Sequence, residues 1–439
     1  MAATFAGSLL AWALRHFVTM VAVLGLAGYV SIYAFNLTDA PIRSDGYSYY
    51  VYLPAWFLHG DATLAAVADE CCGGTFPDFT GIRRWPGTGR WVNPHPIGVA
   101  IQMAPFFAVA HLLTQWSNLP PDGFSLYYQF FAGLSGLTAL LAGLALLRGL
   151  LSRDYSQGVV LATLATVTWG TNAFHYGVYD ATFSHAFSFF LIAALLALTD
   201  RWWTRPSWHV SIGLAVVSAL IVLTRHPNAI FLMIVPLYAV TTPGELRANI
   251  VVLWRRRGVV AAMLAIACLL VAPQLAIYKY ATARWMVSPY EGLGGFTFAS
   301  PHLWGVLFSV QKGLFFWSPA LLMAVAGTFV AAGLARRFRL AAVVVFLLNA
   351  YLIASWFDWP FGGSFGHRAF TDSLALAAVF LAAFYDWASR RPRIVPVVAT
   401  VASICVALSI AQMTQYWLRI LPFGGTTWDQ YRDLFLRFR

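Results

Sequence analysis

Long apolar runs recur along the whole of this 439-residue chain. A helix that spans a bilayer needs about 20 consecutive, mostly apolar residues. Eleven runs of this kind lie at residues 17–35, 124–147, 158–176, 182–199, 209–224, 227–241, 258–277, 314–334, 340–357, 371–388 and 395–413. We therefore predict an all-α polytopic membrane protein with about 11 transmembrane helices, which form a single integral-membrane domain over residues 1–439.

Composition agrees with this class and excludes others. The chain is 60% hydrophobic and 10% charged, whereas a soluble domain is about a quarter charged. A cytosolic globular enzyme, a disordered chain, a collagen-like repeat and a disulfide-rich secreted scaffold are therefore excluded. The net charge of +11 would indicate a nucleic-acid partner in a soluble protein. In a membrane protein the positive-inside bias explains this charge better, so we predict no nucleic-acid partner.

The distribution of the charges predicts the topology. A further apolar run at 97–114 would move most arginine-rich loops to the outer face if it crossed the membrane. If it lies in the outer leaflet instead, the N-terminus and those loops face the cytoplasm. The inner side then holds 15 of the 28 basic residues and four of the 17 acids, which leaves 13 of each sign outside. The positive-inside rule therefore favours a non-spanning 97–114.

Two of the predicted outer loops are long, at residues 36–123 and 278–313. Loops of this length are usually functional, so we expect interfacial helices and the catalytic region in the first and a lid in the second. The first loop contains the adjacent Cys71 and Cys72. Adjacent cysteines rarely close a disulfide, and no metal-ligand spacing is present, so we assign this pair no role.

The segment after the first apolar run carries charges at membrane depth. Asp39, Arg43 and Asp45 lie where the first span should leave the hydrocarbon, and an aromatic stretch that includes Tyr49 follows. Such a stretch is typical of a helix in the interface. The charges belong either to an ordinary interfacial belt or to a carboxylate that faces an amphipathic substrate. Carboxylates at this depth are costly and tend to be functional.

Histidines and a second acid follow in the next outer segments. His95 lies in a Pro-His-Pro stretch before the run 97–114, and it is either structural or a donor to a phosphate or a sugar hydroxyl. Asp180 and His185 lie in the outer turn between the third and fourth predicted spans. This pair either caps a helix or acts in the site.

Cations suited to a phosphate occur in three outer segments. Arg225 lies in a tight turn, where it either snorkels to the interface or contacts a phosphate. The loop 278–313 holds Lys279, Arg284 and a glycine-rich stretch from Glu291, which allows a mobile lid but lacks P-loop spacing.

The third of these segments, 356–372, has three glycines beside His367 and Arg368 at a predicted helix start. It is either an anion site or a polar turn with an interfacial tryptophan pair.

This layout resembles the GT-C glycosyltransferase superfamily, which includes oligosaccharyltransferases, protein O-mannosyltransferases and lipid A aminoarabinose transferases. The resemblance rests on Asp45 after the first span, on the His-Pro stretch at 94–96 and on Asp180 in the second outer turn. It extends to residue 230 and is architectural beyond that point. Many members carry adjacent acids where this chain has Asp45 followed by Gly46. No cofactor is therefore predicted, and dependence on a divalent metal stays open.

The resemblance implies roles for individual residues. Asp45 would be the general base; the tyrosines that follow should raise its pKa by desolvation, and Arg43 should help to hold it ionised. Substrate contacts would come from Asp39, Tyr49, His95, Asp180, His185 and Glu291. A clamp for the donor phosphate would be drawn from Arg225, Lys279, Arg284, His367 and Arg368.

The activity that the resemblance implies is transfer of one sugar from a polyprenyl-phosphate carrier to an acceptor hydroxyl, with inversion at the anomeric carbon. The acceptor would be a lipid, a glycan or a protein, and the site would lie on the periplasmic face of a bacterial inner membrane. The alternatives are a transporter or flippase for a lipid-linked saccharide and an O-antigen-type polymerase. Transporters usually have inverted repeats with interrupted helix pairs, and we find no such pairing in this sequence.

Overall fold

The computed structural model describes residues 2–35, 40–288, 290–292 and 294–438. The described residues are mainly helical. Eight of their helical segments are long and apolar enough to cross a membrane. These segments lie within α1 (Ala2–Ala34), α5 (Gly98–Gln115), α6 (Leu126–Leu151), α9 (Ser184–Thr204), α12 (Arg257–Thr282), α16 (Gly333–Ala354), η3 (Arg368–Ser373) with α17 (Leu374–Ser389), and α18 (Val395–Trp417). The protein is therefore an all-α, multi-pass membrane protein, as its apolar runs predict.

The shorter elements connect these helices or lie at their ends. In chain order they are α2 (Ser44–Tyr50), α3 (Tyr52–Phe57), α4 (Ala65–Cys72), η1 (Asp78–Thr80), β1 (Arg83–Arg84), β2 (Trp91–Val92), α7 (Gln157–Trp169), α8 (Ala173–Val178), α10 (Trp208–Thr224), η2 (His226–Ile234), α11 (Pro243–Arg255), α13 (Leu303–Phe308), α14 (Leu314–Trp317), α15 (Leu321–Phe329) and α19 (Trp428–Leu434). The strands β1 and β2 pair antiparallel with Arg83 opposite Val92.

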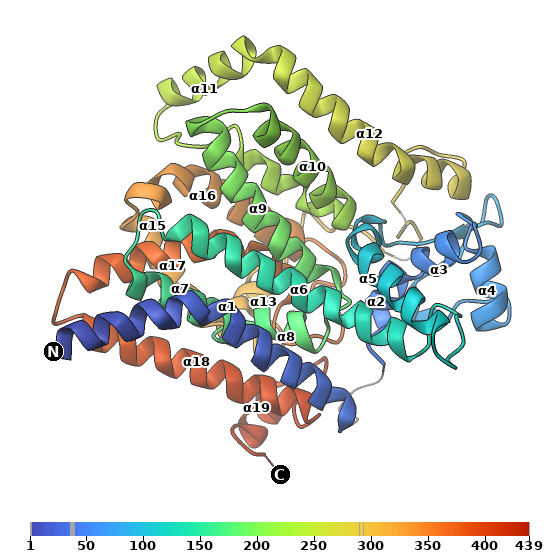
Figure 1. Cartoon of the computed structure of the whole chain (residues 1–439), viewed down its shortest axis with the longest axis horizontal. Helices are drawn as coiled ribbons and strands as arrows, with labels where there is room; N and C mark the ends of the chain where they lie inside the picture. Colours follow the sequence, from blue (N-terminus) through green and yellow to red (C-terminus); the bar gives the residue numbers. More distant parts are fainter. Residues whose placement is uncertain (1, 36–39, 289, 293, 439) are drawn as a thin grey trace.

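The helices divide into a buried centre and a lipid-facing periphery. Within the apolar windows, 72% of the residues of α9 and 78% of those of the η3–α17 segment are buried, against 6% for α12. A helix that is apolar on all sides either lies inside a bundle or faces lipid. Figure 1 shows α9 and α17 inside the bundle, with α12 along its upper edge. We therefore expect the apolar surface of α12 to face lipid.

Four of the predicted spans are not single α-helices. One is the run 371–388, whose first residues belong to the 3₁₀-helix η3. The run 158–176 is divided into α7 and α8 after Trp169, and the run 314–334 is divided into α14 and α15 around Pro319. The run 227–241 begins as the 3₁₀-helix η2 with Pro227 in its first turn. Proline removes a backbone donor and disfavours the α conformation of the preceding residue. The 3₁₀ form rises about 2.0 Å per residue, which lets this short run cover more depth than an α-helix would.

Helix α5 is long enough to span, but its contacts place both of its ends near the same end of the bundle. At its start, a Cβ on Gly98 would lie 2.4 Å from the carbonyl carbon of Leu223, in the last turn of α10. Near its other end, His111 contacts the hydroxyl of Tyr128, in the first turn of α6. The end of α10 and the start of α6 are both predicted to lie outside. The packing therefore favours the predicted non-spanning orientation.

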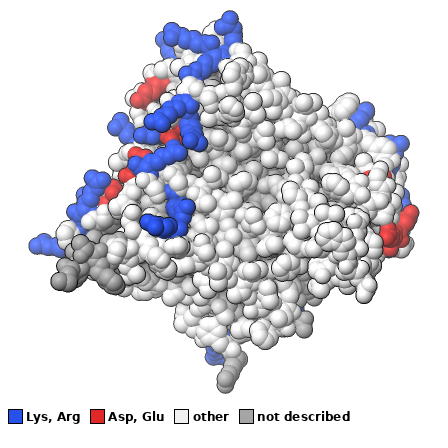
Figure 2. All heavy atoms as spheres, viewed as in Figure 1, with Lys and Arg blue, Asp and Glu red and all other residues white. Residues whose placement is uncertain are grey.

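The loops predicted to face the cytoplasm meet at one end of the molecule. Asp200, near the end of α9, accepts hydrogen bonds from Arg153, from Arg337 and from Tyr238 at 2.7–3.0 Å. Figure 2 shows that Lys and Arg side chains gather along one edge of the molecule, over α11 and the neighbouring helix ends. A broad uncharged band separates this edge from a smaller group of mixed charges. This distribution is the one that the charge bias predicts.

The segment from residue 40 to α5 forms a compact cap at the end opposite the basic edge, where Figure 1 shows α2 to α5 together. The cap contacts the last turn of α12, where Arg90 donates a hydrogen bond to the carbonyl of Tyr280 at 2.8 Å. It contains one departure from expectation. Cys71 and Cys72 form a disulfide even though their Cα atoms are only 3.8 Å apart, below the usual 4.4–6.8 Å range on which the expectation rested.

Candidate functional site

A cavity of about 520 Å³ opens between the cap and the ends of the helices. Its lining comes from segments far apart in the sequence: the start of α2, the loop before α5, the start of α9, the turn after α10, the loop after α12 and the start of η3. Six of the predicted site residues line it: Asp45, Tyr49, His95, His185, Arg225 and Arg368. Polar side chains and aromatic rings share its walls, as in sites that bind amphipathic ligands.

Asp45 enters the cavity from the first turn of α2. The residue before it, Ser44, has a φ of +48°, a backbone conformation that residues other than glycine rarely adopt. The residue after it must be glycine, because a Cβ on Gly46 would lie 2.0 Å from Oγ1 of Thr182. The segment around Asp45 is therefore pressed closely against the turn before α9.

The Asp45 carboxylate is paired with a guanidinium. Its Oδ2 lies 3.0 Å from Nη1 of Arg368 and 3.9 Å from Nε2 of His95. Burial raises the pKa of Asp45, but the charges of Arg368 and then His95 outweigh burial and hold the pKa below its ordinary value. This corrects the prediction that neighbouring tyrosines raise it and that Arg43 opposes them. Asp45 is therefore ionised at neutral pH and retains the capacity to accept a proton.

His95 lies beside this pair as a neutral side chain. Burial lowers the pKa of His95 to about 4 although Asp45 is close. Its ring packs edge-on against Tyr49 at 4.5 Å between centroids. Among the described residues, its Nδ1 has no hydrogen-bond partner. A neutral imidazole can donate or accept one hydrogen bond there, so His95 is equipped to contact a polar ligand group.

A second carboxylate–guanidinium pair lies on another wall of the cavity. The fully buried Asp372 accepts from Arg225 at 2.5 Å, from Asn228 at 3.0 Å and from His185 at 3.1 Å. Arg225 keeps part of its guanidinium exposed in the cavity, with 15% of the side chain accessible. Because the Asp372 carboxylate already accepts three hydrogen bonds, its role is to hold Arg225 and His185 in place. The two arginines of the cavity are thus each neutralised by a carboxylate.

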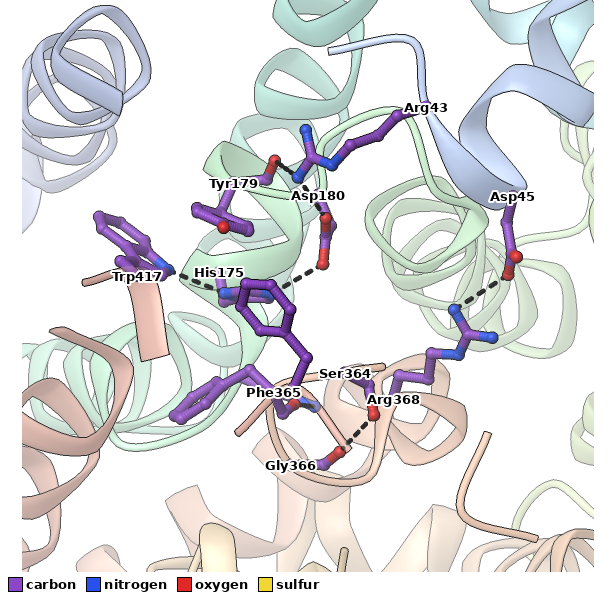
Figure 3. Close-up of polar contacts among 12 residues, drawn as sticks. Arg43, Asp45, His175, Tyr179, Asp180, Ser364, Phe365, Gly366, Arg368 and Trp417 are labelled. Atoms are coloured by element: carbon purple, nitrogen blue, oxygen red, sulfur yellow. Dashed lines mark hydrogen bonds and ion pairs between the residues drawn. The ribbon is translucent and has the colours of Figure 1, made fainter. Parts of the chain in front are cut away.

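Asp180 lies outside the cavity lining, behind the first pair. Its Oδ1 accepts from Arg43 at 2.6 Å and its Oδ2 faces Nε2 of His175 at 2.9 Å. This overturns the expected Asp180–His185 pair, since His185 bonds Asp372 instead. Figure 3 shows the two centres side by side, with Arg43, Asp180 and His175 on one side and Asp45 with Arg368 on the other.

Aromatic residues close the cavity on the side of the second long loop. Trp356 packs edge-on against Tyr290 and Phe296, with ring centroids 5.2 and 5.0 Å apart. The backbone of Phe296 also forms a bridge with that of Trp356. The expected lid is therefore attached to the segment after α16 in this structure. Residues 289 and 293 of the loop lie outside the described residues.

Several predicted site residues lie away from the cavity. Lys279 bonds the carbonyl of Ala283, and Arg284 forms an exposed ion pair with Glu291 at 3.2 Å. His367 packs against aromatic rings, and burial lowers its pKa to about 3. These four described residues are not part of the cavity lining, so the predicted clamp is reduced to Arg225 and Arg368. Asp39 lies outside the described residues.

Two residues of the site are missed by the sequence-based assignment. Asp372 follows Arg368 by four positions, and its position in a predicted outer segment was the only signal available. Lys312 is 2% exposed and donates to the carbonyls of Ser364 and Phe423. It is one of only two lysines in the chain. This rarity was the sequence signal for Lys312, and it says nothing of burial or of partners.

Among the described residues, no group of three or more His, Cys, Asp or Glu side chains is placed to hold a metal ion. No protein-family model matches the chain, and no curated protein is significantly similar to it. The site must therefore be interpreted from its own chemistry.

Proposed function

We propose that the protein is a membrane glycosyltransferase of GT-C type, which transfers a sugar from a lipid-phosphate carrier to an acceptor hydroxyl at the outer face of a bacterial inner membrane. The observation that carries this proposal is the Asp45–Arg368 pair, which faces a cavity of about 520 Å³ at the end of the bundle opposite the basic edge. The pair places a base, Asp45, next to a cation that can bind phosphate, Arg368. Both face a cavity in which a lipid headgroup and a polar acceptor can meet.

The reaction needs one base and one stabilised leaving group. The acceptor oxygen attacks the anomeric carbon while Asp45 takes its proton, and the bond from that carbon to the phosphate oxygen breaks. The electron pair stays on the lipid phosphate, whose negative charge rises from one to two. Guanidinium groups stabilise developing charge of this kind, and Arg368 and Arg225 are the cationic side chains of the cavity. A single displacement inverts the anomeric carbon.

Pairing with Arg368 links donor binding to the activation of the base. A donor phosphate that contacts Arg368 shares the guanidinium with Asp45. The positive potential at Asp45 then falls, and its pKa rises from the lowered value it has in the unliganded site. A carboxylate with a higher pKa is a stronger base, so Asp45 becomes a better proton acceptor when the donor is bound.

The direct test uses the purified full-length protein in nanodiscs. It is supplied with polyprenyl-phosphate-linked sugars of defined composition and with extracted envelope lipids as acceptors. We expect release of lipid phosphate together with a new glycosidic bond. Asp45→Asn should lower the transfer rate by about 10²–10⁴-fold because the amide cannot accept the proton.

Asp69→Asn is the matched control, since Asp69 is an exposed acid of the same cap outside the cavity lining. Movement of the lipid-linked sugar across the bilayer with no change in its bonds would contradict the proposal and favour a transporter. Equal transfer by the parent protein and Asp45→Asn would exclude Asp45 as the base.

A further inference from the structure

Asp180 lies too deep to contact a ligand in the cavity. Its side chain is 7% exposed, and it is not among the described residues that line the cavity. Both of its carboxylate oxygens already accept hydrogen bonds from charged or ring donors. Burial raises the pKa of Asp180, but Arg43 and then His175 outweigh burial and lower the pKa to about 2. The carboxylate is thus a permanent anion with a fixed partner.

That partner belongs to the segment that carries Asp45. Arg43 lies two residues before Asp45 and directly precedes α2. Its guanidinium contacts the Asp180 carboxylate, donates to the carbonyl of Tyr179 at 3.0 Å and lies over the Tyr179 ring at 5.1 Å. One side chain therefore makes three contacts with the turn before α9.

The same two segments are joined at further points. Thr182 donates its hydroxyl to the carbonyl of Pro41 at 2.8 Å, and Gly46 packs on Thr182 without room for a side chain. Between these points, Ser44 keeps its unfavourable positive φ. A strained residue persists only where its surroundings hold it. The contacts on either side of Ser44 are those surroundings, and they determine the direction of the next side chain, Asp45.

The far side of Asp180 is also held. The indole nitrogen of Trp417 donates to Nδ1 of His175 at 2.9 Å. An indole N–H can only donate, so Nδ1 is the acceptor and the proton of the neutral imidazole is on Nε2. That proton is donated to Asp180. The chain of contacts in Figure 3 thus runs from the end of α18 through α8 to the segment before α2.

We propose that Asp180 is a positioning residue, which through Arg43 holds residues 40–46 on the turn before α9 and keeps Asp45 in the cavity. This assigns Asp180 a role different from the substrate contact that the family resemblance implies. We call the contact of residues 40–46 with the turn before α9, made through Arg43 and Asp180, the tether. The effect of the tether on the transfer rate rests on the proposed function, whereas the existence of the tether does not.

The kinetic test compares Asp180→Asn in two backgrounds. A misplaced catalytic group typically costs about 100-fold in rate, so Asp180→Asn should lower kcat by about that factor with KM for the donor within threefold. In the Asp45→Asn background the same substitution should change the residual rate by less than threefold, because no base remains to be positioned. An equal loss in both backgrounds, or a loss confined to donor KM, would show that Asp180 acts on substrate directly and would overturn the proposal.

The structural test measures hydrogen exchange of backbone amides in residues 42–50, in nanodiscs and without any substrate. Asp180→Asn and Arg43→Gln each break the ion pair and should speed this exchange by about tenfold, and Arg43→Lys should restore part of the protection because a cation remains. Arg43→Gln also serves if Asp180→Asn fails to fold.

Asp200→Asn is the matched control, since Asp200 is an equally buried acid with two arginine partners at the other end of the bundle. It should leave exchange at residues 42–50 unchanged. Unchanged exchange in both Asp180→Asn and Arg43→Gln would overturn the tether. Failure of the parent protein to transfer any sugar would count against the proposed function alone, because the exchange result would still stand.

Discussion

At the scale of single residues, the site consists of cations that are already paired. Arg368 bonds Asp45, and Arg225 bonds Asp372. A phosphate that enters the cavity therefore competes with a carboxylate for each guanidinium. Arginine suits this exchange because its planar group offers five donors and serves two acceptors at once. Arg368 is the more informative of the two, because its partner is the proposed base.

Two replacements of Arg368 should distinguish the effect of its paired hydrogen-bond donors from the effect of its positive charge. Arg368→Lys keeps a positive charge but loses the two parallel donors, so the donor KM should rise by about tenfold. Arg368→Ala should raise it further. Because the Arg368 charge lowers the pKa of Asp45, the alanine variant should also shift the acid limb of the activity profile to higher pH. Steady-state kinetics between pH 4 and pH 8 measures both effects, and an unchanged donor KM in Arg368→Ala would remove this residue from the clamp.

Lys312 joins three segments of the chain close to Arg368. Its ammonium group donates to the carbonyl of Ser364, which precedes Arg368, and to that of Phe423 near the C-terminus. Burial, and then the charge of Arg368, lowers the pKa of Lys312 to about 7. The amine therefore loses its proton in the folded protein well below its ordinary pKa of 10.5.

This lowered pKa predicts a pH dependence of stability with a definite sign. Between pH 7 and pH 10 the unfolded chain binds more protons at Lys312 than the folded protein does. The contribution of Lys312 to stability therefore rises with pH in this window and is smallest below pH 7. Thermal unfolding in nanodiscs at pH 6.5 and pH 9 should show a larger gain for the parent protein than for Lys312→Met. An identical gain in the two proteins would mean that Lys312 is charged throughout.

At the scale of elements, helix boundaries depended on backbone chemistry that hydropathy does not report. The run 314–334 satisfies an apolar criterion, yet Pro319 divides it into α14 and α15. The run 227–241 has Pro227 at its start and folds as the 3₁₀-helix η2. A missing backbone donor and a steric clash decide these cases. The number of spans thus stays a prediction, whereas the membrane class does not depend on it.

The orientation of α5 can be measured by cysteine accessibility. With Cys268 replaced by serine, Gly87→Cys in the cap and Trp116→Cys after α5 should both react with a membrane-impermeant thiol reagent from the outer side. Trp116 is 83% exposed, so the rest of the protein does not shield this position from the reagent. Ser152→Cys, in an arginine-rich loop, should react only from the inner side. Reaction of Gly87→Cys and Trp116→Cys from opposite sides would show that α5 crosses the membrane.

At the scale of the whole molecule, charge divides the protein into two chemically different ends. The basic end holds Arg153 and Arg337, from loops predicted to face the cytoplasm, paired with Asp200. The other end holds the cap, the cavity and the paired charges of the site. By the positive-inside rule, the excess of positive charge at one end predicts that this end faces the cytoplasm. At the other end, each arginine of the cavity is paired with a carboxylate.

The sequence alone determined the class of this protein, and it predicted which loops share a side of the membrane and six of the residues that line the cavity. These follow from local properties, because hydrophobic length is set by bilayer thickness and orientation by counts of basic residues. Only the tertiary structure decided which charges meet: Asp45 with Arg368, Asp180 with Arg43, and Asp372 with Arg225. The partners in these pairs lie more than 130 residues apart in the chain. Pairing at such separations is chosen by helix packing and by the cost of leaving a buried charge unpaired, and neither is recorded in the spacing of residues along the chain.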